Sequence, residues 1–321
     1  MNSILQEQWY AVCRASQVGK RPLGLTRFGR TIVLWRAPDG TISCFFDACP
    51  HRGAALSRGR SVDGCLACPY HGLRFDKDGR CTCMPPHPDG PIPERMQLRR
   101  FPCRIEHNLV WVWNGNDTET LPPLPWDDEL NAELQADGGP FLDLEDAFAV
   151  NYLRVMENLS DFHHVAHVHR RTAPVPGRME NIEVTRTGTH VRVHGELASA
   201  DGKRRFAAST HLVAPSMGIL HFEGLARFAA IATPIDENNT WLFARYTQTA
   251  VRIPGLTTIL TWLFGQFDYR LLQRLEDYPV WRSQRLERPD DVGRYTWLRA
   301  DEGVRQFFEA YAELRDSAPP A

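Results

Sequence analysis

The chain has 321 residues, of which 43% are apolar, so it can bury the core of one or two domains. Its 37 basic and 39 acidic residues leave a net charge of −2, which gives no support for binding to nucleic acid. Residues 1–14 lack the apolar stretch of a signal peptide, and the apolar stretch 256–267 is too short to span a bilayer. We therefore expect a cytoplasmic protein with no nucleic-acid partner and no membrane span.

Short strands with turns between them are predicted in the first third of the chain. Runs of β-branched and aromatic residues alternate with turn signals such as Asp39-Gly40 and Asp78-Gly79, a pattern typical of antiparallel hairpins. The proline-rich stretch 85–93 predicts a loop. The predicted strands lie at 9–12, 31–35, 41–46 and 109–113.

Beyond this region the pattern changes to mixed helix and strand. We predict a first domain over 1–118, a polar, proline-bearing linker over 119–140 and a second domain over 141–321. The second domain is expected to be α+β with an antiparallel sheet. It has a helical spacing at 151–169, strand-like alternation at 181–250, and helices at 256–284, with a kink or break, and at 301–315.

Two matched pairs of cysteine and histidine indicate a metal cluster in the first domain. Sixteen residues separate Cys49 and His51 from Cys68 and His71, and no cysteine occurs after Cys103. This spacing is typical of a Rieske [2Fe-2S] centre. A structural zinc site is the alternative, but zinc pairs usually have two to four residues between the ligands. Gly53 and Gly72 are expected to let backbone amides approach the sulfides of the cluster.

A second metal site is indicated by four histidines between 163 and 169. On a continuous helix His163 and His167 share a face, as do His164 and His167. His164 and His169 can share a site only if the helix unwinds before residue 169. Two imidazoles alone would leave a non-haem iron site incomplete, because such a site also takes one carboxylate ligand. The candidates on the penultimate helix are Asp268, Glu276 and Asp277.

Both constellations resemble a known family, the Rieske-type non-haem iron oxygenases. Residues 49–54 (CPHRGA) and 68–75 (CPYHGLRF) are similar to the Rieske domains of ring-hydroxylating and demethylating oxygenases. The family motif N-x2-D-x2-H-x4-H matches this chain in full, at Asn158, Asp161, His164 and His169. The resemblance implies an α+β fold in which an antiparallel β Rieske domain precedes a helix-grip-like, antiparallel-sheet catalytic domain.

The resemblance also implies a role for each matched residue. Cys49, His51, Cys68 and His71 would hold the [2Fe-2S] cluster. His164 and His169 would hold a mononuclear Fe(II), with Asp277 as the third ligand, because residues 276–284 resemble the family's E-D-x6-Q segment. Asn158 and Asp161 would belong to the catalytic site. Asp161 would link His71 of the partner subunit to His164 within a head-to-tail homotrimer.

The expected activity is that of an oxygenase component similar to vanillate and dicamba demethylases and saxitoxin-pathway hydroxylases. It would use O2 and electrons from an NAD(P)H-dependent reductase, with or without a ferredoxin, to hydroxylate or demethylate a small organic substrate. A cis-dihydroxylating dioxygenase would share the same ligands. A protein that only transfers electrons would leave the second site without a purpose.

The expected substrate is cyclic and largely apolar, with a few polar anchors. The polar residues expected in its cavity come from the sheet. An aromatic stripe on the penultimate helix is expected either to roof the cavity or to be ordinary core. These residues are His211, His221, Phe222, Arg227 and Arg245 on the sheet, and Trp262, Phe264 and Phe267 on the helix.

Overall fold

The chain folds into two compact units. One contains residues 6–124, and the other contains residues 125–321 together with the first five residues. The computed structural model describes residues 4–117, 120–126, 131, 139–172, 177–199, 203, 205–284 and 292–317. Most of the expected linker, 119–140, lies outside the described residues.

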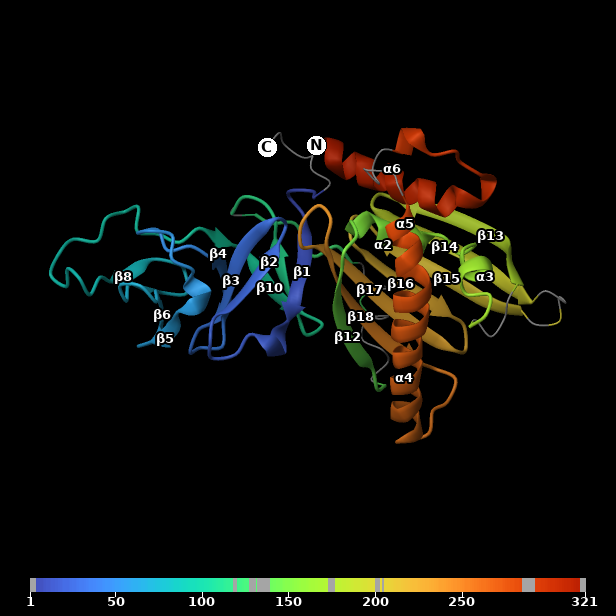
Figure 1. Ribbon diagram of the computed structural model, residues 1–321, viewed down its shortest axis with the longest axis horizontal. Coiled ribbons are helices and arrows are strands. Elements are labelled where there is room, and N and C mark those ends of the chain that lie inside the picture. Colours follow the sequence, from blue (N-terminus) through green and yellow to red (C-terminus); the bar gives the residue numbers. More distant parts are fainter. Residues whose placement is uncertain are drawn as a thin grey trace. The chain divides into compact units, whose positions relative to one another are not determined.

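The first unit consists of three small antiparallel sheets (Figure 1). The first sheet has the order β1-β11-β10 and is built from β1 (Trp9–Arg14), β11 (Leu109–Trp113) and β10 (Cys103–Glu106). The second is ordered β2 (Leu23–Arg27), β3 (Arg30–Arg36), β4 (Ile42–Phe46), β9 (Arg100–Phe101). The third is ordered β5 (Arg60–Val62), β6 (Cys65–Ala67), β7 (Arg74–Phe75), β8 (Cys81–Cys83). The predicted strands are therefore confirmed.

A small apolar core packs against the two loops that carry the predicted iron–sulfur ligands. Trp35 and Phe45 from the second sheet, together with Leu66 and Phe75 from the third, are fully buried in one hydrophobic cluster. Cys49 and Cys68 belong to the same cluster, although they come from different loops. The core thus holds the two cysteine loops next to one another.

The second unit is built on a seven-stranded antiparallel sheet. Its strands β13 to β18 follow one another as a meander, and β12 pairs with β18 at the edge. The strands are β12 (Leu142–Phe148), β13 (Gly177–Thr187), β14 (His190–Ser199), β15 (Arg205–Val213), β16 (Met217–Phe222), β17 (Ala226–Pro234) and β18 (Thr240–Gln248). The α+β fold class with antiparallel sheets is confirmed.

Helices pack on one face of this sheet (Figure 1). The first is α2 (Tyr152–Ser160), which packs against β15, β16 and β17. The helix α4 (Leu256–Phe267) packs against β12 and β18, and α6 (Glu302–Ser317) packs against β13 and β14. The buried apolar side chains of these helices and of the sheet form one core. In the described part of the chain, no helix is long and apolar enough to cross a membrane.

The prediction of one helix over 151–169 is wrong in the middle of that range. The helix α2 ends at Ser160, Asp161 is extended (φ −105°, ψ 106°), and a separate short helix α3 (Val165–Val168) follows. The Asp161 carboxylate accepts a hydrogen bond from the backbone N–H of His163 at 2.7 Å. A side chain that binds the backbone in this way competes with the helical hydrogen bonds, which accounts for the break.

The predicted kink in the penultimate helix is a π-helix. The helical run consists of α4, the π-helix η4 (Asp268–Asp277) and α5 (Tyr278–Ser283). A π-helix of this length is unusual, and π-helical segments frequently occur at functional sites. This segment carries all three candidate carboxylates of the second metal site.

Candidate metal centres

The two cysteine loops of the first unit have the same backbone design. In each loop the cysteine N–H donates to the carbonyl five residues later, and the glycine four residues later donates to the cysteine carbonyl. In the first loop, Cys49 N–H lies 2.9 Å from Ala54 O and Gly53 N–H lies 2.8 Å from Cys49 O. The corresponding distances in the second loop are 2.8 Å from Cys68 to Leu73 and 3.1 Å from Gly72 to Cys68.

The two loop glycines have a structural role within their own loops. Gly53 and Gly72 have φ of 73° and 69°, so they supply the left-handed turn that closes each loop. Their own amides donate to the cysteine carbonyls, and the approach of neighbouring amides to the sulfides stays a prediction.

The four predicted cluster residues are brought together, and their donor atoms suit an iron–sulfur group. Cys49 and Cys68 are only 3% and 2% exposed. The rings of His51 and His71 have centroids 4.8 Å apart, and His71 Nδ1 is buried without a hydrogen-bond partner among the described residues. Burial raises the pKa of Cys49 to about 11, so a bound metal cation is needed to favour the thiolate.

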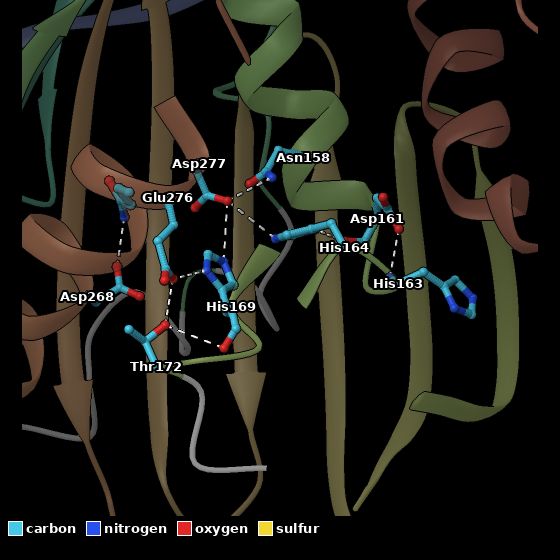
Figure 2. A network of polar contacts seen from close by, with 10 residues as sticks. Asn158, Asp161, His163, His164, His169, Thr172, Asp268, Glu276 and Asp277 are labelled. Carbon is cyan, nitrogen blue, oxygen red and sulfur yellow. Dashed lines mark hydrogen bonds and ion pairs between the residues drawn. The ribbon is translucent and has the colours of Figure 1, made fainter. Parts of the chain in front are cut away.

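The three predicted mononuclear ligands also converge, in the second unit (Figure 2). His164 precedes α3, His169 follows it, and Asp277 is the last residue of η4. Asp277 Oδ1 lies 3.3 Å from His169 Nε2 and 3.7 Å from His164 Nε2. One ligand atom from each residue lies within 4.8 Å of the other two. Two imidazoles and a carboxylate on one side match the facial triad of non-haem iron.

The neighbours of these side chains fix how the rings are oriented. His169 Nδ1 donates to Glu276 Oε2 at 2.8 Å, and Thr172 Oγ1 donates to the same oxygen at 2.5 Å (Figure 2). His164 Nδ1 contacts the backbone carbonyl of Asp161 at 2.5 Å. In both rings Nδ1 is therefore the donor, which leaves Nε2 for a metal.

The carboxylates also set the charge of this site. Burial lowers the pKa of His169, but the hydrogen bonds and charges of Asp277 and Glu276 outweigh it, so the pKa is raised. The site thus favours a positive charge, which a metal cation supplies. Asn158 Nδ2 donates to Asp277 Oδ1 at 3.4 Å and helps to hold that carboxylate.

The other acids and histidines of the two segments have different positions. Asp268 lies on η4 but pairs with Tyr246 Oη at 2.9 Å, so the structure does not bring it into the ligand group. His163 is partly buried and His167 is exposed. Glu276 was a candidate ligand in the sequence, and the structure gives it an orienting contact to His169. Its position next to Asp277 in the sequence was the signal for that role.

A cavity of about 570 Å³ reaches the three mononuclear ligands. Its wall is mostly apolar and comes from α2 to α5, η4 and five neighbouring strands, of which β14 contributes Leu197. On the other four strands, β15 to β18, the lining residues all have even numbers, because alternate side chains point to the same face. They are Phe206 on β15, Leu220 and Phe222 on β16, Ala226, Phe228 and Ala230 on β17, and Leu242 and Gln248 on β18.

The expected polar anchors on the sheet are therefore wrong. His211, His221, Arg227 and Arg245 have odd numbers and belong to the opposite face. Arg245, for example, makes two hydrogen bonds of 2.8 and 2.9 Å to the Asp143 carboxylate.

The aromatic stripe divides between two environments. Phe264 and Phe267 line the cavity, as does Phe222 on the sheet. Trp262 is 52% exposed and is not a lining residue. The alternative that the whole stripe is ordinary core is therefore wrong.

Comparisons with known proteins agree with both halves of this description. A family profile for the Rieske [2Fe-2S] domain matches residues 8–102. The chain is 33% identical over 175 residues to the dicamba O-demethylase oxygenase component of Stenotrophomonas maltophilia, and 32% identical over 190 residues to the vanillate O-demethylase oxygenase subunit of Pseudomonas sp. strain HR199. These matches cover 53% and 54% of this chain, and 49% of each relative, so the chain spans about half the length of these curated relatives.

The whole chain has the fold of a solved oxygenase. It superimposes on dicamba monooxygenase bound to 3,6-dichlorosalicylic acid with a TM-score of 0.81 and 24% identity, covering 98% of each chain. The chain therefore contains a Rieske [2Fe-2S] domain, and its relatives in sequence and in fold are named as oxygenase components. The predicted cofactors, a Rieske [2Fe-2S] cluster and a mononuclear non-haem iron, are confirmed.

Proposed function

We propose that this chain is the oxygenase component of a Rieske non-haem iron monooxygenase. It uses O2 and electrons from an NAD(P)H-dependent reductase, directly or through a ferredoxin, to hydroxylate or demethylate a cyclic, largely apolar organic substrate. The observation that carries the proposal is the apolar cavity whose wall includes His164, His169 and Asp277. These three residues would hold a metal at the wall of the cavity, where a bound organic molecule is shielded from much of the bulk water.

The residue assignments are part of this proposal. Cys49 and Cys68 hold one iron of the cluster, and His51 and His71 hold the other, as in Rieske centres generally.

In the second unit, His164 Nε2, His169 Nε2 and the Asp277 carboxylate hold Fe(II). When bound, this iron activates O2 at the coordination positions that a two-histidine, one-carboxylate set leaves open. Glu276 keeps the His169 ring in the Nδ1–H tautomer, and Asn158 keeps the Asp277 carboxylate turned toward the two imidazoles.

Asp161 is proposed to connect the two metal sites across a subunit boundary. In a homotrimer its carboxylate would accept a hydrogen bond from His71 of the partner subunit. Its backbone carbonyl already accepts the Nδ1 hydrogen of His164, and it lines the cavity. Together the two contacts would form a short hydrogen-bonded path for electrons.

A cytoplasmic location is also part of the proposal. No disulfide joins the eight cysteines, all of which lie in the described part of the chain. Thiols of this kind suit a reducing compartment.

The test is a screen of cyclic, uncharged organic compounds with the purified protein, a reductase, NADH and O2. The expected result is substrate-dependent NADH and O2 consumption, with one ¹⁸O atom from ¹⁸O2 in the primary product. A diol with two ¹⁸O atoms would instead identify a cis-dihydroxylating dioxygenase. If the Asp277→Ala variant reoxidises its cluster as fast as the wild type and neither forms product, the protein only transfers electrons.

A further inference from the structure

The cavity has few polar groups apart from those around the metal ligands. The described lining includes Gln248, Asp268 and Gln273, and none of its described residues is Arg or Lys. Both ends of the Gln248 amide are engaged by Val251. Nε2 donates to the Val251 carbonyl at 2.7 Å, and Oε1 accepts from the Val251 N–H at 3.0 Å. Each end of the Gln248 amide is therefore already paired within the protein.

Gln273 differs because only one end of its amide is engaged. Its Nε2 donates to Tyr246 Oη at 2.9 Å and to Asp268 Oδ2 at 2.8 Å. Its Oε1 is buried and has no hydrogen-bond partner among the described residues, and the whole side chain is only 6% exposed. Buried amide oxygens without a partner are rare, because their desolvation is not offset.

The surroundings also determine which end of the amide is left unpaired. Tyr246 Oη donates to Asp268 Oδ2 at 2.9 Å, so the carboxylate and the phenol oxygen both present lone pairs to Gln273. Only the NH2 end of the amide can satisfy them. Hydrogen bonds in a π-helix join residues five apart, so Asp268 and Gln273 lie on the same side of η4, and both line the cavity.

We propose that Gln273 Oε1 is the polar anchor of the substrate, and that the substrate is an uncharged molecule with a hydroxyl or N–H donor on an apolar ring system. An acceptor oxygen pairs with such a donor and cannot pair with a carboxylate. Asp268 and Asp161 also line the cavity and oppose an anion, whereas the metal that Asp277 would hold offsets the charge of Asp277. This inference rests on the proposed function, since it names the substrate class of the same cavity.

Binding of three matched probes to the unreacted protein, kept without reductant, tests the proposal by isothermal titration calorimetry. The probes are 2-naphthol, 2-methoxynaphthalene, which lacks the donor, and 2-naphthoate, which is anionic. We expect 2-naphthol to bind the wild type about fivefold more tightly than 2-methoxynaphthalene, as for one hydrogen bond. We expect 2-naphthoate to bind more weakly than both.

Two variants separate the anchor from a merely structural role. Gln273→Met should remove the difference between 2-naphthol and 2-methoxynaphthalene and leave the affinity for 2-methoxynaphthalene unchanged. Gln306→Met on α6, where the amide donates to Glu302 at 2.9 Å on another part of the unit, is the matched control and should keep the difference. Gln273→Glu retains an acceptor oxygen and should keep part of the preference for 2-naphthol.

The proposal is overturned if the wild type binds 2-naphthol and 2-methoxynaphthalene equally, or binds neither. It is also overturned if 2-naphthoate binds most tightly, or if Gln273→Met weakens both neutral probes alike. Because these measurements involve no turnover, a failed oxygenation screen with an intact binding preference would refute the enzymatic function and leave the anchor standing. A successful oxygenation screen without the binding preference would refute only the role of Gln273 as the anchor.

Discussion

Removing the charge from Glu276 should lower the affinity of the mononuclear site for its metal, although Glu276 is not itself a ligand. In the wild type, Glu276 Oε2 accepts hydrogen bonds from His169 Nδ1 at 2.8 Å and from Thr172 Oγ1 at 2.5 Å. A group that orients a metal-binding histidine in this way is typically worth about 10- to 100-fold in metal affinity, or about 1.4 to 2.7 kcal/mol. Glu276→Gln keeps the shape and an acceptor oxygen, so we expect a loss near the lower value, with Glu276→Ala near the upper one.

The pH dependence of metal binding provides a second measurement on the same variants. Glu276 and Asp277 raise the pKa of His169, and a proton on this ring competes with the metal. Wild-type affinity should therefore fall as the pH drops through that raised pKa. In Glu276→Gln the pKa is lowered, so the decline should begin at a lower pH and the affinities of the two proteins should converge in acid.

Equilibrium dialysis with Fe(II) under anaerobic conditions measures both effects, and the visible spectrum of the cluster shows whether the first unit is intact. The exposed Glu223→Gln, in the turn between β16 and β17, is the charge-matched control and should bind iron normally. An unchanged affinity and pH profile in both Glu276 variants would refute the orienting role.

Four further predictions concern the cluster, the interface and the packing. The loaded protein should contain about three irons per chain, and Cys68→Ser should lose the visible absorption of the cluster while retaining the mononuclear iron; stoichiometric zinc in a colourless protein would contradict this. Co-expressed Cys68→Ser and Asp277→Ala chains, each inactive alone, should regain part of the activity in mixed trimers purified by two tags, whereas inactive mixed trimers would exclude electron transfer between subunits. Gly59→Ala should lower the free energy of unfolding of the first unit by about 1 to 3 kcal/mol in urea, because an added Cβ would lie 2.1 Å from the Ala67 carbonyl oxygen. Burial raises the pKa of Cys103 to about 11, so this thiol should resist alkylation at pH 8 in the native protein, as mass spectrometry can check, and should react after unfolding.

The parts of the site that could be predicted are those encoded in short, fixed spacings. The pairs Cys49/His51 and Cys68/His71 each lie within a single loop, so their sequence already implies their proximity. The strand and helix patterns were likewise local, and they gave the α+β class. The choice of His164 and His169 needed the family resemblance, because local helical geometry favoured His163 and His167. The structure shows that this rule did not apply, since α2 ends at Ser160.

The parts that could not be predicted depend on which face of an element meets the cavity. Alternation along β15 to β18 separates odd from even residues, but both faces of the sheet contain apolar side chains. Polar residues such as His211 and Arg245 were therefore assigned to the wrong side. The π-helix was also not predicted from the sequence, although it places Asp268 and Gln273, which are five residues apart, on one wall of the cavity. Helical periodicity assumes α geometry, so it does not align residues five apart.

The alternation of the sheet separates substrate recognition from chemistry in a way that protein engineering can use. Leu220, Phe222 and Leu242 face the cavity from β16 and β18, whereas the mononuclear ligands lie on or beside the helical segments α3 and η4. A combinatorial library at these three strand positions would change the shape of the chamber while leaving every metal-binding side chain in place. Variants with new substrates could thus be selected by changing the sheet alone, while the metal ligands on the helical segments stay the same.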